Sequence, residues 1–448
     1  MPVSYLQNSK NCDTLFSMNK SPNPGSKKKT IFYGWIVVAC VFVILFVMFG
    51  SAYSFSTFFE SLQAEFDASR SSISFVFAIA GFIYFSLGAI SGQIADRFGS
   101  RRVIIFGLIV VSISFFLASR VETIWQIYAV YGLGIGIGIG FAYAPAISVV
   151  QRWFVKRRGL ASGLAVTGIG LGTLGMPVFS AALIHWSDWR NAYLVISILI
   201  FICGVSAAIF IPESPQRCGL LPDGDDINAN AINASQETDK PKAAVIREIS
   251  LKDALHTKPF WFLYAGSFSF GLGLFIPFVH LIPFSNDLGL PNATGVMLFS
   301  LIGVGSTVGR FLLGSIADRI GRRLSLVMMY AGAAAIFAWW LAAANVWQLA
   351  IFALIYGACY GGYVAIMPAV AADYFSGPNI SGVIGTLITS VAVGNLIGPP
   401  IAGFIFDLFH SYTIPIFASI ITSLFAAGCA FVLEEPDKWR ESFLHSTA

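Results

Sequence analysis

The chain has 448 residues, of which 56% are hydrophobic and only 11% are charged, whereas soluble domains carry about 25% charged residues. This composition excludes a soluble globular protein and indicates one embedded in a membrane. The net charge of +4 reflects the distribution of basic residues about the membrane and indicates no nucleic-acid partner.

The N-terminal part predicts a tail followed by six membrane helices. Residues 1–32 are polar and Lys-rich, with no apolar core before a cleavage site, so we expect a tail and not a signal peptide. The apolar runs that follow are long enough to cross about 30 Å of hydrocarbon. They predict a first bundle over 33–212, with helices at 33–58, 73–94, 103–119, 124–149, 159–184 and 191–212.

A polar stretch, 213–258, separates this bundle from a second one and predicts a flexible linker. The second bundle covers 259–433 and a short tail covers 434–448. Its predicted helices lie at 260–284, 294–316, 324–343, 346–372, 380–404 and 411–433. The expected fold class is therefore an all-α membrane protein with twelve transmembrane helices in two six-helix bundles.

Basic residues lie mainly on one side of this predicted topology. The side that holds both termini carries 23 of the 27 Lys and Arg residues. Because Lys and Arg accumulate in cytoplasmic loops, we expect both termini in the cytoplasm and the protein in the plasma (inner) membrane. Three arginines fall on the opposite face. One basic residue, Arg310, remains inside a span, and no Asp or Glu lies in a span interior.

A charged motif occurs twice in the chain. Its first copy is Gly92-Gln-Ile-Ala-Asp96-Arg97-Phe-Gly99-Ser-Arg101-Arg102, and its second copy, Gly314-Ser-Ile-Ala-Asp318-Arg319-Ile-Gly321-Arg322-Arg323, begins 222 residues later. The same offset relates Gly163, Gly172 and Pro177 to Gly385, Gly394 and Pro399. Two parallel six-helix halves are typical of transporters that rock one half against the other.

This duplicated motif, together with the twelve spans, resembles the major facilitator superfamily over residues 31–435. Within that superfamily the chain is similar to the monocarboxylate transporters and their bacterial relatives, including the oxalate:formate antiporters. The closer similarity lies in residues 33–35 with 50–55, in 152–163, in 277–283 and in Arg310. The resemblance implies a small carboxylate substrate.

The duplicated motif is expected to be a gate. A carboxylate at a helix end can face a neighbouring helix terminus or an arginine and so latch the two halves in one state. The alternative is a set of solvated loop charges, but chance would not place one pattern twice at matching depth. Neither copy should contact substrate. The expected gating residues are Gly92, Asp96, Arg97, Gly99, Arg101, Gly314, Asp318, Arg319, Gly321 and Arg322.

Arg310 is the main candidate for substrate binding. A guanidinium inside the bilayer is costly and usually functional, and its fork matches a carboxylate. The alternative is that it reaches toward the interface, but the repeat places Gly88 at the equivalent position, so the charge belongs to one half only. In the resembled family an arginine of the eighth helix binds the substrate carboxylate. Ser306, one turn earlier, replaces an Asp of the mammalian members and offers a hydroxyl.

His280 is the only histidine well inside a predicted span, between Pro277 and Pro283. Each proline removes a backbone donor, so we expect the helix to bend and to face a polar cavity. An imidazole there can bind a carboxylate or take up the coupled proton. The alternative is a satisfied core histidine. Because His280 lies nearer the outer end than Arg310, a gating role is also open.

The remaining candidates for the cavity are Tyr143, Tyr360, Tyr363 and Asn395. The tyrosines follow glycine-rich runs, where small residues let helices pack closely, so a packing role is equally compatible with them. Asn395 falls where the resembled oxalate:formate exchangers place a second cation. It is neutral here, which argues against a dicarboxylate.

We therefore expect a secondary transporter of small monocarboxylates, lactate- or pyruvate-like, coupled to a proton and working by alternating access. The alternatives are a carboxylate anion exchanger and a non-transporting membrane sensor, although the polar segments are too short for a soluble output domain. An enzyme is not expected, and neither a cofactor nor a metal site is indicated. The expected partners are the substrate, the proton and the lipid bilayer, and the chain is expected to act as a monomer.

Overall fold

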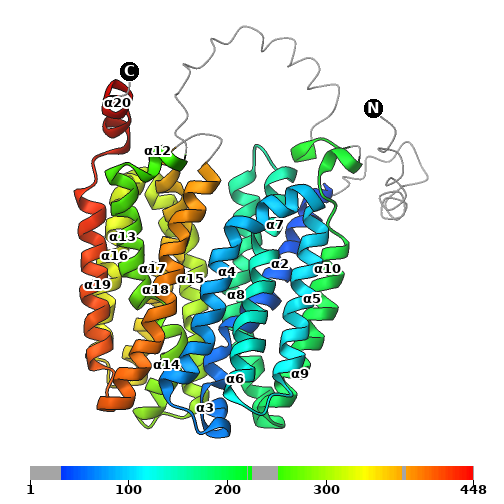
Figure 1. The fold of residues 1–448 in the computed structure, drawn as a ribbon, viewed down its shortest axis with the longest axis vertical. Helices are drawn as coiled ribbons and strands as arrows, with labels where there is room; N and C mark the ends of the chain where they lie inside the picture. Colours follow the sequence, from blue (N-terminus) through cyan, green and yellow to red (C-terminus); the bar gives the residue numbers. More distant parts are fainter. Residues whose placement is uncertain (1–31, 219, 225–250, 376–379, 447–448) are drawn as a thin grey trace.

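The computed structural model of the chain describes residues 32–218, 220–224, 251–375 and 380–446. Within these ranges the chain is helical, and twelve helical segments are long and apolar enough to cross a membrane. The predicted all-α fold with twelve spans is therefore confirmed (Figure 1). The predicted tail before residue 32 and the centre of the predicted linker lie outside the described residues.

The first half holds six spans, three of which are divided into shorter segments. Their bounds are α2 (Tyr33–Tyr53) with α3 (Phe55–Phe66), α4 (Arg70–Phe98), α5 (Ser100–Ala118), α6 (Ile124–Ile127) with η1 (Tyr128–Ile135) and α7 (Gly136–Trp153), α8 (Arg158–Trp186), and α9 (Trp189–Leu199) with η2 (Ile200–Val205) and α10 (Ser206–Ile209). Two short turns follow, η3 (Pro215–Cys218) and η4 (Pro222–Gly224).

The second half repeats this order after a short helix, α12 (Leu251–Leu255). A further helix, α20 (Pro436–Ser446), follows its last span. The spans are α13 (Lys258–Leu274) with α14 (Ile276–Asp287), α15 (Asn292–Ile320), α16 (Arg322–Leu341), α17 (Val346–Tyr374), α18 (Ile380–Phe409) and α19 (Thr413–Val432).

The duplicated motif is mostly helical, although the predicted spans 73–94 and 294–316 end inside its two copies. Helices α4 and α15 continue through Asp96 and Asp318, and each ends at the last glycine of its motif copy. Gly99 and Gly321 have φ of 92° and 94°, values that a residue with a Cβ rarely adopts. The connection to the next helix is therefore a single residue in both halves, and the motif charges sit on rigid helix ends.

The first span of each half breaks at an equivalent height. The first half breaks at Ser54 and the second at Phe275, 221 residues later. In the second half the cause is Pro277, which occupies the first turn of α14 and has no N–H to continue α13. Pro283 frees the carbonyl of Val279, and Ser56 of the other half donates to that oxygen at 3.0 Å. The expected bend near the prolines is confirmed.

Two long helix pairs join the halves. Helix α4 of the first half packs along α18 of the second, and α8 packs along α15; Figure 1 shows α4 beside α18. We call these the α4/α18 seam and the α8/α15 seam. The repeat offset converts α4 into α15 and α8 into α18, so the two seams are equivalent by internal symmetry.

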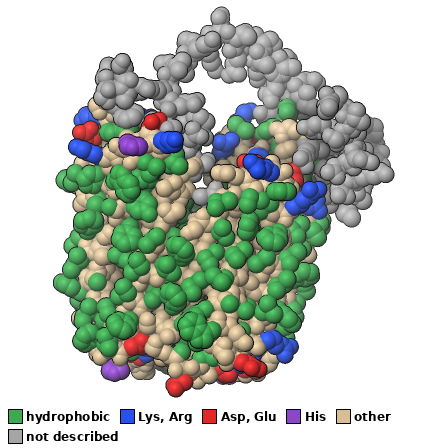
Figure 2. All heavy atoms as spheres, in the orientation of Figure 1, with side chains coloured by type: hydrophobic (Ala, Val, Ile, Leu, Met, Phe, Trp, Pro, Cys, Tyr) green, Lys and Arg blue, Asp and Glu red, His purple; other side chains and the backbone are tan. Residues whose placement is uncertain are grey.

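The bundle has two distinct ends. We call the end that holds residue 33 and α20 the tail end, and the opposite end the far end (Figure 1). Hydrophobic side chains cover the middle of the surface, and charged side chains gather toward both ends (Figure 2). This is the pattern of a protein that lies across a bilayer. Near the tail end, a Cβ added at Gly88 or Gly92 would have no described atom of another helix within 4 Å. Among the described residues, the close packing of the α4/α18 seam therefore does not extend to these two glycines.

Candidate functional site

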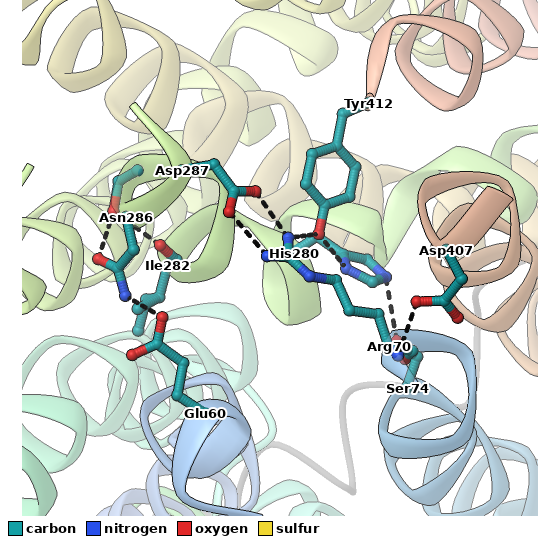
Figure 3. Close-up of polar contacts among 10 residues, drawn as sticks. Glu60, Arg70, Ser74, His280, Ile282, Asn286, Asp287, Asp407 and Tyr412 are labelled. Atoms are coloured by element: carbon teal, nitrogen blue, oxygen red, sulfur yellow. Dashed lines mark hydrogen bonds and ion pairs between the residues drawn. The ribbon is translucent and has the colours of Figure 1, made fainter. Parts of the chain in front are cut away.

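Arg70 joins the halves at the far end (Figure 3). Its Nη1 and Nη2 donate to the two carboxylate oxygens of Asp287, both at 2.7 Å, and Nη1 also donates to the hydroxyl of Tyr412 at 2.8 Å. The guanidinium carbon lies 3.8 Å from the centre of the Phe406 ring. Such a paired, two-pronged contact is the strongest kind of ion pair in proteins.

Asp407 of α18 adds a second contact between the same halves. Its two carboxylate oxygens accept the backbone N–H groups of Arg70 and Ser71, each at 3.0 Å. These N–H groups begin α4, where a helix has unpaired donors and a partial positive charge. Asn286 donates to Glu60 at 2.5 Å nearby. The far end is thus closed by groups of opposite charge that come from different halves.

His280 belongs to this far-end layer and is fully buried. Its Nε2 lies 2.9 Å from the carbonyl oxygen of Pro399 and 3.1 Å from Ser74 Oγ, and its Nδ1 lies 3.0 Å from the Tyr412 hydroxyl. A carbonyl only accepts, so these partners assign the hydrogen to Nε2. Nδ1 then accepts from Tyr412, and the imidazole is neutral. None of these contacts involves Arg310, so the two predicted substrate residues lie in different layers.

The α4/α18 seam continues inward from this layer through further polar contacts. Ser71 donates to the carbonyl of Pro400 at 3.1 Å, and Asn395 donates to the carbonyl of Ala78, also at 3.1 Å. Asn395 is fully buried, and a Cβ on Gly81 would lie 2.1 Å from its Nδ2. In this state Asn395 therefore ties the halves together, whereas the sequence suggested a place in the cavity.

A group of three tyrosines lies at the middle of the molecule. The hydroxyl of Tyr53 is 3.3 Å from that of Tyr84 and 3.1 Å from that of Tyr360, which belongs to the other half. Phe278 packs 5.0 Å from both Tyr53 and Tyr360. The two hydrogen bonds use two of the three hydroxyl hydrogens, so one hydroxyl of this group has a hydrogen with no acceptor inside the group.

Of these tyrosines, sequence reasoning identified only Tyr360. Tyr53 lies within residues 50–55, one of the segments that carry the family resemblance, so a signal for it was present. Tyr84 lies in an apolar run in which an aromatic residue has no distinguishing pattern. Only the fold brings its hydroxyl to the other two.

Arg310 lies at the α8/α15 seam and lacks an acidic partner. Its Nη1 donates to the carbonyl oxygen of Val166 in the first half at 2.9 Å, whereas its Nε is buried and has no hydrogen-bond partner. Among the described residues, no carboxylate lies within ion-pairing distance of it. Tyr143 and Tyr360 both interact electrostatically with its charge. The structure thus brings together three of the predicted substrate residues, Arg310, Tyr143 and Tyr360.

The α8/α15 seam beside Arg310 is built from small residues. A Cβ on Gly303 would lie 2.5 Å from the carbonyl oxygen of Gly170, and one on Gly170 would lie 1.9 Å from Thr307 Oγ1. Such close backbone approach is typical of helices that pack in membranes through glycines. Arg310 therefore extends from the edge of a tight, largely apolar contact.

The two remaining predicted substrate residues are buried in the second half. Ser306 is 2% exposed. It packs against Gly361, where an added Cβ would lie 2.1 Å from the carbonyl oxygen of Ser306. Its hydroxyl has no hydrogen-bond partner among the described residues. Tyr363 packs against the rings of Phe270 and Tyr330. The hydroxyl of Tyr363 also has no hydrogen-bond partner among the described residues, and Ser306 lies one turn from Arg310.

The motif charges form ion pairs within each half. Arg152 donates to Asp96 at 2.8 Å, and Arg322 donates to Asp373 at 2.8 Å. Arg152 and Asp373 lie 221 residues apart, so equivalent helix ends carry opposite charges. The side chain of Asp318 is outside the described residues. In this state the described pairs stay inside a half, and neither forms the predicted latch between halves.

The segment after α10 folds onto the motif. A Cβ on Gly99 would lie 2.0 Å from a carboxylate oxygen of Glu213, so that carboxylate covers the start of α5. Asp223 accepts the backbone N–H groups of Val155 and Lys156 at 2.8 Å each. Partial burial opposes ionisation, but these hydrogen bonds prevail and lower the pKa of Asp223 below its ordinary value. The first part of the predicted linker is therefore ordered against the first half.

Comparison with known families and structures agrees with this architecture. The family model described as Major Facilitator Superfamily matches residues 41–343 and 298–447. A Danio rerio protein named Monocarboxylate transporter 12-B is 28% identical over 403 residues, which cover 86% of this chain and 84% of the relative. A Paecilomyces divaricatus protein named Agnestins efflux protein AgnL12 is 27% identical over 405 residues, covering 89% of this chain and 86% of the relative.

Among solved structures, a D-xylose-proton symporter superposes with a TM-score of 0.69 over 90% of this chain and 99% of that chain. The sequence identity in that superposition is 14%, so it demonstrates a shared fold only.

Proposed function

The chain belongs to the Major Facilitator Superfamily, and we propose that it carries a small monocarboxylate such as lactate or pyruvate across the membrane by alternating access. The observation that carries the proposal is the unpaired guanidinium of Arg310 at the seam between the halves. Similarity to monocarboxylate transporters supports the substrate class.

The hydrogen-bond donors around Arg310 that lack an acceptor favour an anionic ligand. The guanidinium has donors and no acceptor, its Nε has no partner, and one tyrosine hydroxyl hydrogen remains available. A carboxylate offers only acceptors and matches the planar fork of an arginine. One fixed positive charge with a neutral Asn395 favours one carboxylate over two.

The distribution of contacts supports alternating access. Polar bonds between halves close the far end, whereas a Cβ added at Gly88 or Gly92 near the tail end would have no described atom of another helix within 4 Å. The tail-end side of the topology carries 23 of the 27 Lys and Arg residues, so we assign this end to the cytoplasm. The state described here is then open toward the cytoplasm and closed toward the outside.

Arg310 also gives a reason for coupling between loading and closure. A buried, unpaired guanidinium is costly, and a bound carboxylate offsets that cost. Closing the tail end around an empty Arg310 is therefore less favourable than closing it around a loaded one.

Replacement of Arg310 tests the substrate site. We expect Arg310→Ala in proteoliposomes to lower saturable lactate or pyruvate uptake by roughly 10- to 100-fold, the range for a lost charge-assisted hydrogen bond. Arg310→Lys should recover part of the loss, because it keeps the charge without the fork. Arg120→Ala, which removes an exposed arginine, is the matched control. Normal uptake by Arg310→Ala would refute the proposed role.

Two further measurements address the alternatives. A thermal-shift screen against mono- and dicarboxylates should show stabilisation by monocarboxylates in preference to dicarboxylates. An imposed pH gradient alone should drive uptake if a proton is coupled, and should have no effect on an anion exchanger. Binding without any uptake would instead indicate a sensor.

A further inference from the structure

We propose that His280 takes up the coupled proton only while the far end is open, and that Arg70 enforces this timing. The inference rests on the proposed function, because it names the site and the controlling residue of the proton in that transport cycle. It makes Arg70 a positioning residue for proton binding, in addition to its role in closing the far end.

The closed geometry leaves no place for a second proton on His280. Its Nε2 hydrogen is directed at the Pro399 carbonyl, and its Nδ1 accepts from the Tyr412 hydroxyl. That hydroxyl in turn accepts from Nη1 of Arg70. A proton on Nδ1 would leave the Tyr412 hydrogen without its acceptor and would place an imidazolium and a guanidinium on the same oxygen. In the closed state His280 is therefore held neutral.

The groups of this layer separate when the halves move apart. Arg70 and Ser74 belong to α4 of the first half, whereas His280, Tyr412 and the Pro399 carbonyl belong to the second half. Ser74 Oγ donates to the backbone carbonyl of Arg70 at 2.6 Å, so both leave together with the end of α4. Opening the far end therefore removes Arg70 from the Tyr412 oxygen, which is then free to accept a hydrogen bond from a protonated Nδ1.

Opening also changes the sign of the charge that faces His280. In the closed state Arg70 neutralises Asp287 and approaches His280 through Tyr412. Asp287 and Asp407 both remain with the second half when Arg70 leaves. Asp287 lies on the helix of His280, two turns away, roughly 10 Å along the axis. Two uncompensated carboxylates on the same half then favour the imidazolium.

The other ionisable groups of this region do not cancel this change. Glu60 comes from α3 of the first half and is bonded to Asn286, so it also departs on opening. The loss of its carboxylate opposes protonation of His280, but Arg70 acts more directly, because it bonds to the same hydroxyl that His280 contacts. His410 packs edge-on to Phe406, with ring centres 6.1 Å apart, and belongs to the second half. The second half therefore keeps both carboxylates and loses its only arginine partner in this network.

The predicted consequence is a far end that opens at low pH and closes at high pH. A group that binds a proton more tightly in one state shifts the equilibrium toward that state as pH falls. His280 binds its proton in the open state, so acid favours opening, and deprotonation is required before Arg70 can dock again.

The test measures the opening of the far end directly. Spin labels at Glu122→Cys and Ala344→Cys, in a background without the six native cysteines, report it by double electron–electron resonance in nanodiscs. Both positions are exposed and lie at the far end, 222 residues apart, one in each half. From about pH 8 to pH 5.5, a window that spans an ordinary histidine titration, we expect the long-distance population to grow by roughly five- to 150-fold relative to the short one.

Four variants separate a proton site from a merely structural contact. His280→Gln should make the distance distribution independent of pH. Arg70→Gln should raise the open population at pH 8 and move the remaining pH response to higher pH, and Arg70→Lys should restore part of the wild-type profile. Tyr412→Phe frees Nδ1 while keeping the ring, so it too should move the response to higher pH and tests the proposal even if His280→Gln does not fold.

The outcomes distinguish this inference from the proposed function. If the wild-type distances do not change with pH, or if His280→Gln keeps the wild-type response, the inference is wrong. If Arg70→Gln opens the far end without moving the pH response, Arg70 is a structural latch only. Carboxylate uptake that depends on Arg310 can persist in both cases. Conversely, a pH-dependent far end in a protein that transports no carboxylate would refute the proposed function alone.

Discussion

The two seams between the halves are equivalent by internal symmetry, yet they are held together differently. Each contains an arginine that the other lacks. Arg70 stands at the far end of the α4/α18 seam, where the repeat places Asn292 in the other seam, and Arg310 stands in the α8/α15 seam, where the repeat places Gly88. Arg70 is paired with a carboxylate and capped by aromatic rings. The hydrogen bond of Arg310 to a described residue is to a backbone carbonyl.

The difference separates two tasks that a rocking transporter must perform. The α4/α18 seam joins charged and amide groups of opposite halves, which can be exchanged for water when the far end opens. The α8/α15 seam joins backbones through Gly170 and Gly303, which can slide without breaking strong bonds. A charge kept unpaired beside the second seam is then available to a ligand.

The largest predicted loss of stability follows a substitution in the α8/α15 seam. Gly303→Ala places a Cβ 2.5 Å from the Gly170 carbonyl oxygen and 2.6 Å from the Leu174 nitrogen. Backbone atoms cannot move aside separately, so we expect a loss of about 3 kcal/mol or more and little transport. Thermal denaturation and uptake in proteoliposomes check this. Gly428→Ala in α19, where no further described atom lies within 4 Å of the added Cβ, should behave like wild type. Equal damage from both would contradict the assignment of the seam.

The equivalent substitution in the α4/α18 seam is predicted to cost less stability, and a second substitution should reverse most of the loss. Gly81→Ala places its Cβ 2.1 Å from Asn395 Nδ2, which is the end of a side chain. We expect a loss of about 1–3 kcal/mol, and Asn395→Ala in the same chain should relieve most of it, as a double-mutant cycle would show.

The corresponding double variant in the α8/α15 seam provides the comparison with Gly81 and Asn395. Thr173→Ala should not rescue Gly303→Ala, because the atom of Thr173 nearest to that Cβ is its backbone carbon. Rescue in both seams, or in neither, would remove the distinction between them.

A smaller effect is expected where the tyrosine group bridges the halves. Tyr53→Phe removes the hydroxyl that lies 3.1 Å from Tyr360, and one net hydrogen bond contributes about 1 kcal/mol. The open population of the far end should rise about fivefold in the spin-label measurement. Tyr131→Phe is the matched control, because its hydroxyl bonds to the Ala52 carbonyl within the first half. It should leave the distance distribution unchanged.

The smallest effect lies outside both seams, at Asp223. Its pKa is lowered in the folded chain, so its stabilising contribution is present above the ordinary pKa of an aspartate and is lost as pH falls through the lowered value. Asp223→Asn keeps one acceptor and tolerates the φ of 60°. We expect faster limited proteolysis after residue 212 in this variant near neutral pH, with the difference from wild type disappearing in acid. A difference that persists in acid would mean that the charge is not responsible.

Periodicity and composition carry most of the information about the fold. Twelve apolar runs, a repeat offset and two prolines in one span predicted the spans, their division into two repeated halves and the bend in the seventh span. The predicted spans ended inside the motif copies, but only Gly99 and Gly321 leave the helix. Charged residues at a helix end lower the mean hydropathy without ending the helix, so apolar runs underestimate helix length.

The far-end layer was not predictable in the same way. Arg70 was counted as one of the basic residues of the outer face, and its partners Asp287 and Tyr412 lie 217 and 342 residues away in sequence. No local pattern reports such a contact. Arg310 was identifiable because its cost in the bilayer is a property of the residue itself, whereas the importance of Arg70 depends on what the fold places beside it.

The bond between Ser56 and the Val279 carbonyl has a pharmacological consequence. Pro283 leaves that oxygen without a helical donor, and the closed far end supplies one from the other half at 3.0 Å. In the transport cycle proposed above, opening of the far end would leave this oxygen without a donor on the outward-facing side. An inhibitor that enters from outside and donates one hydrogen bond to this oxygen would replace Ser56 and hold the two halves apart.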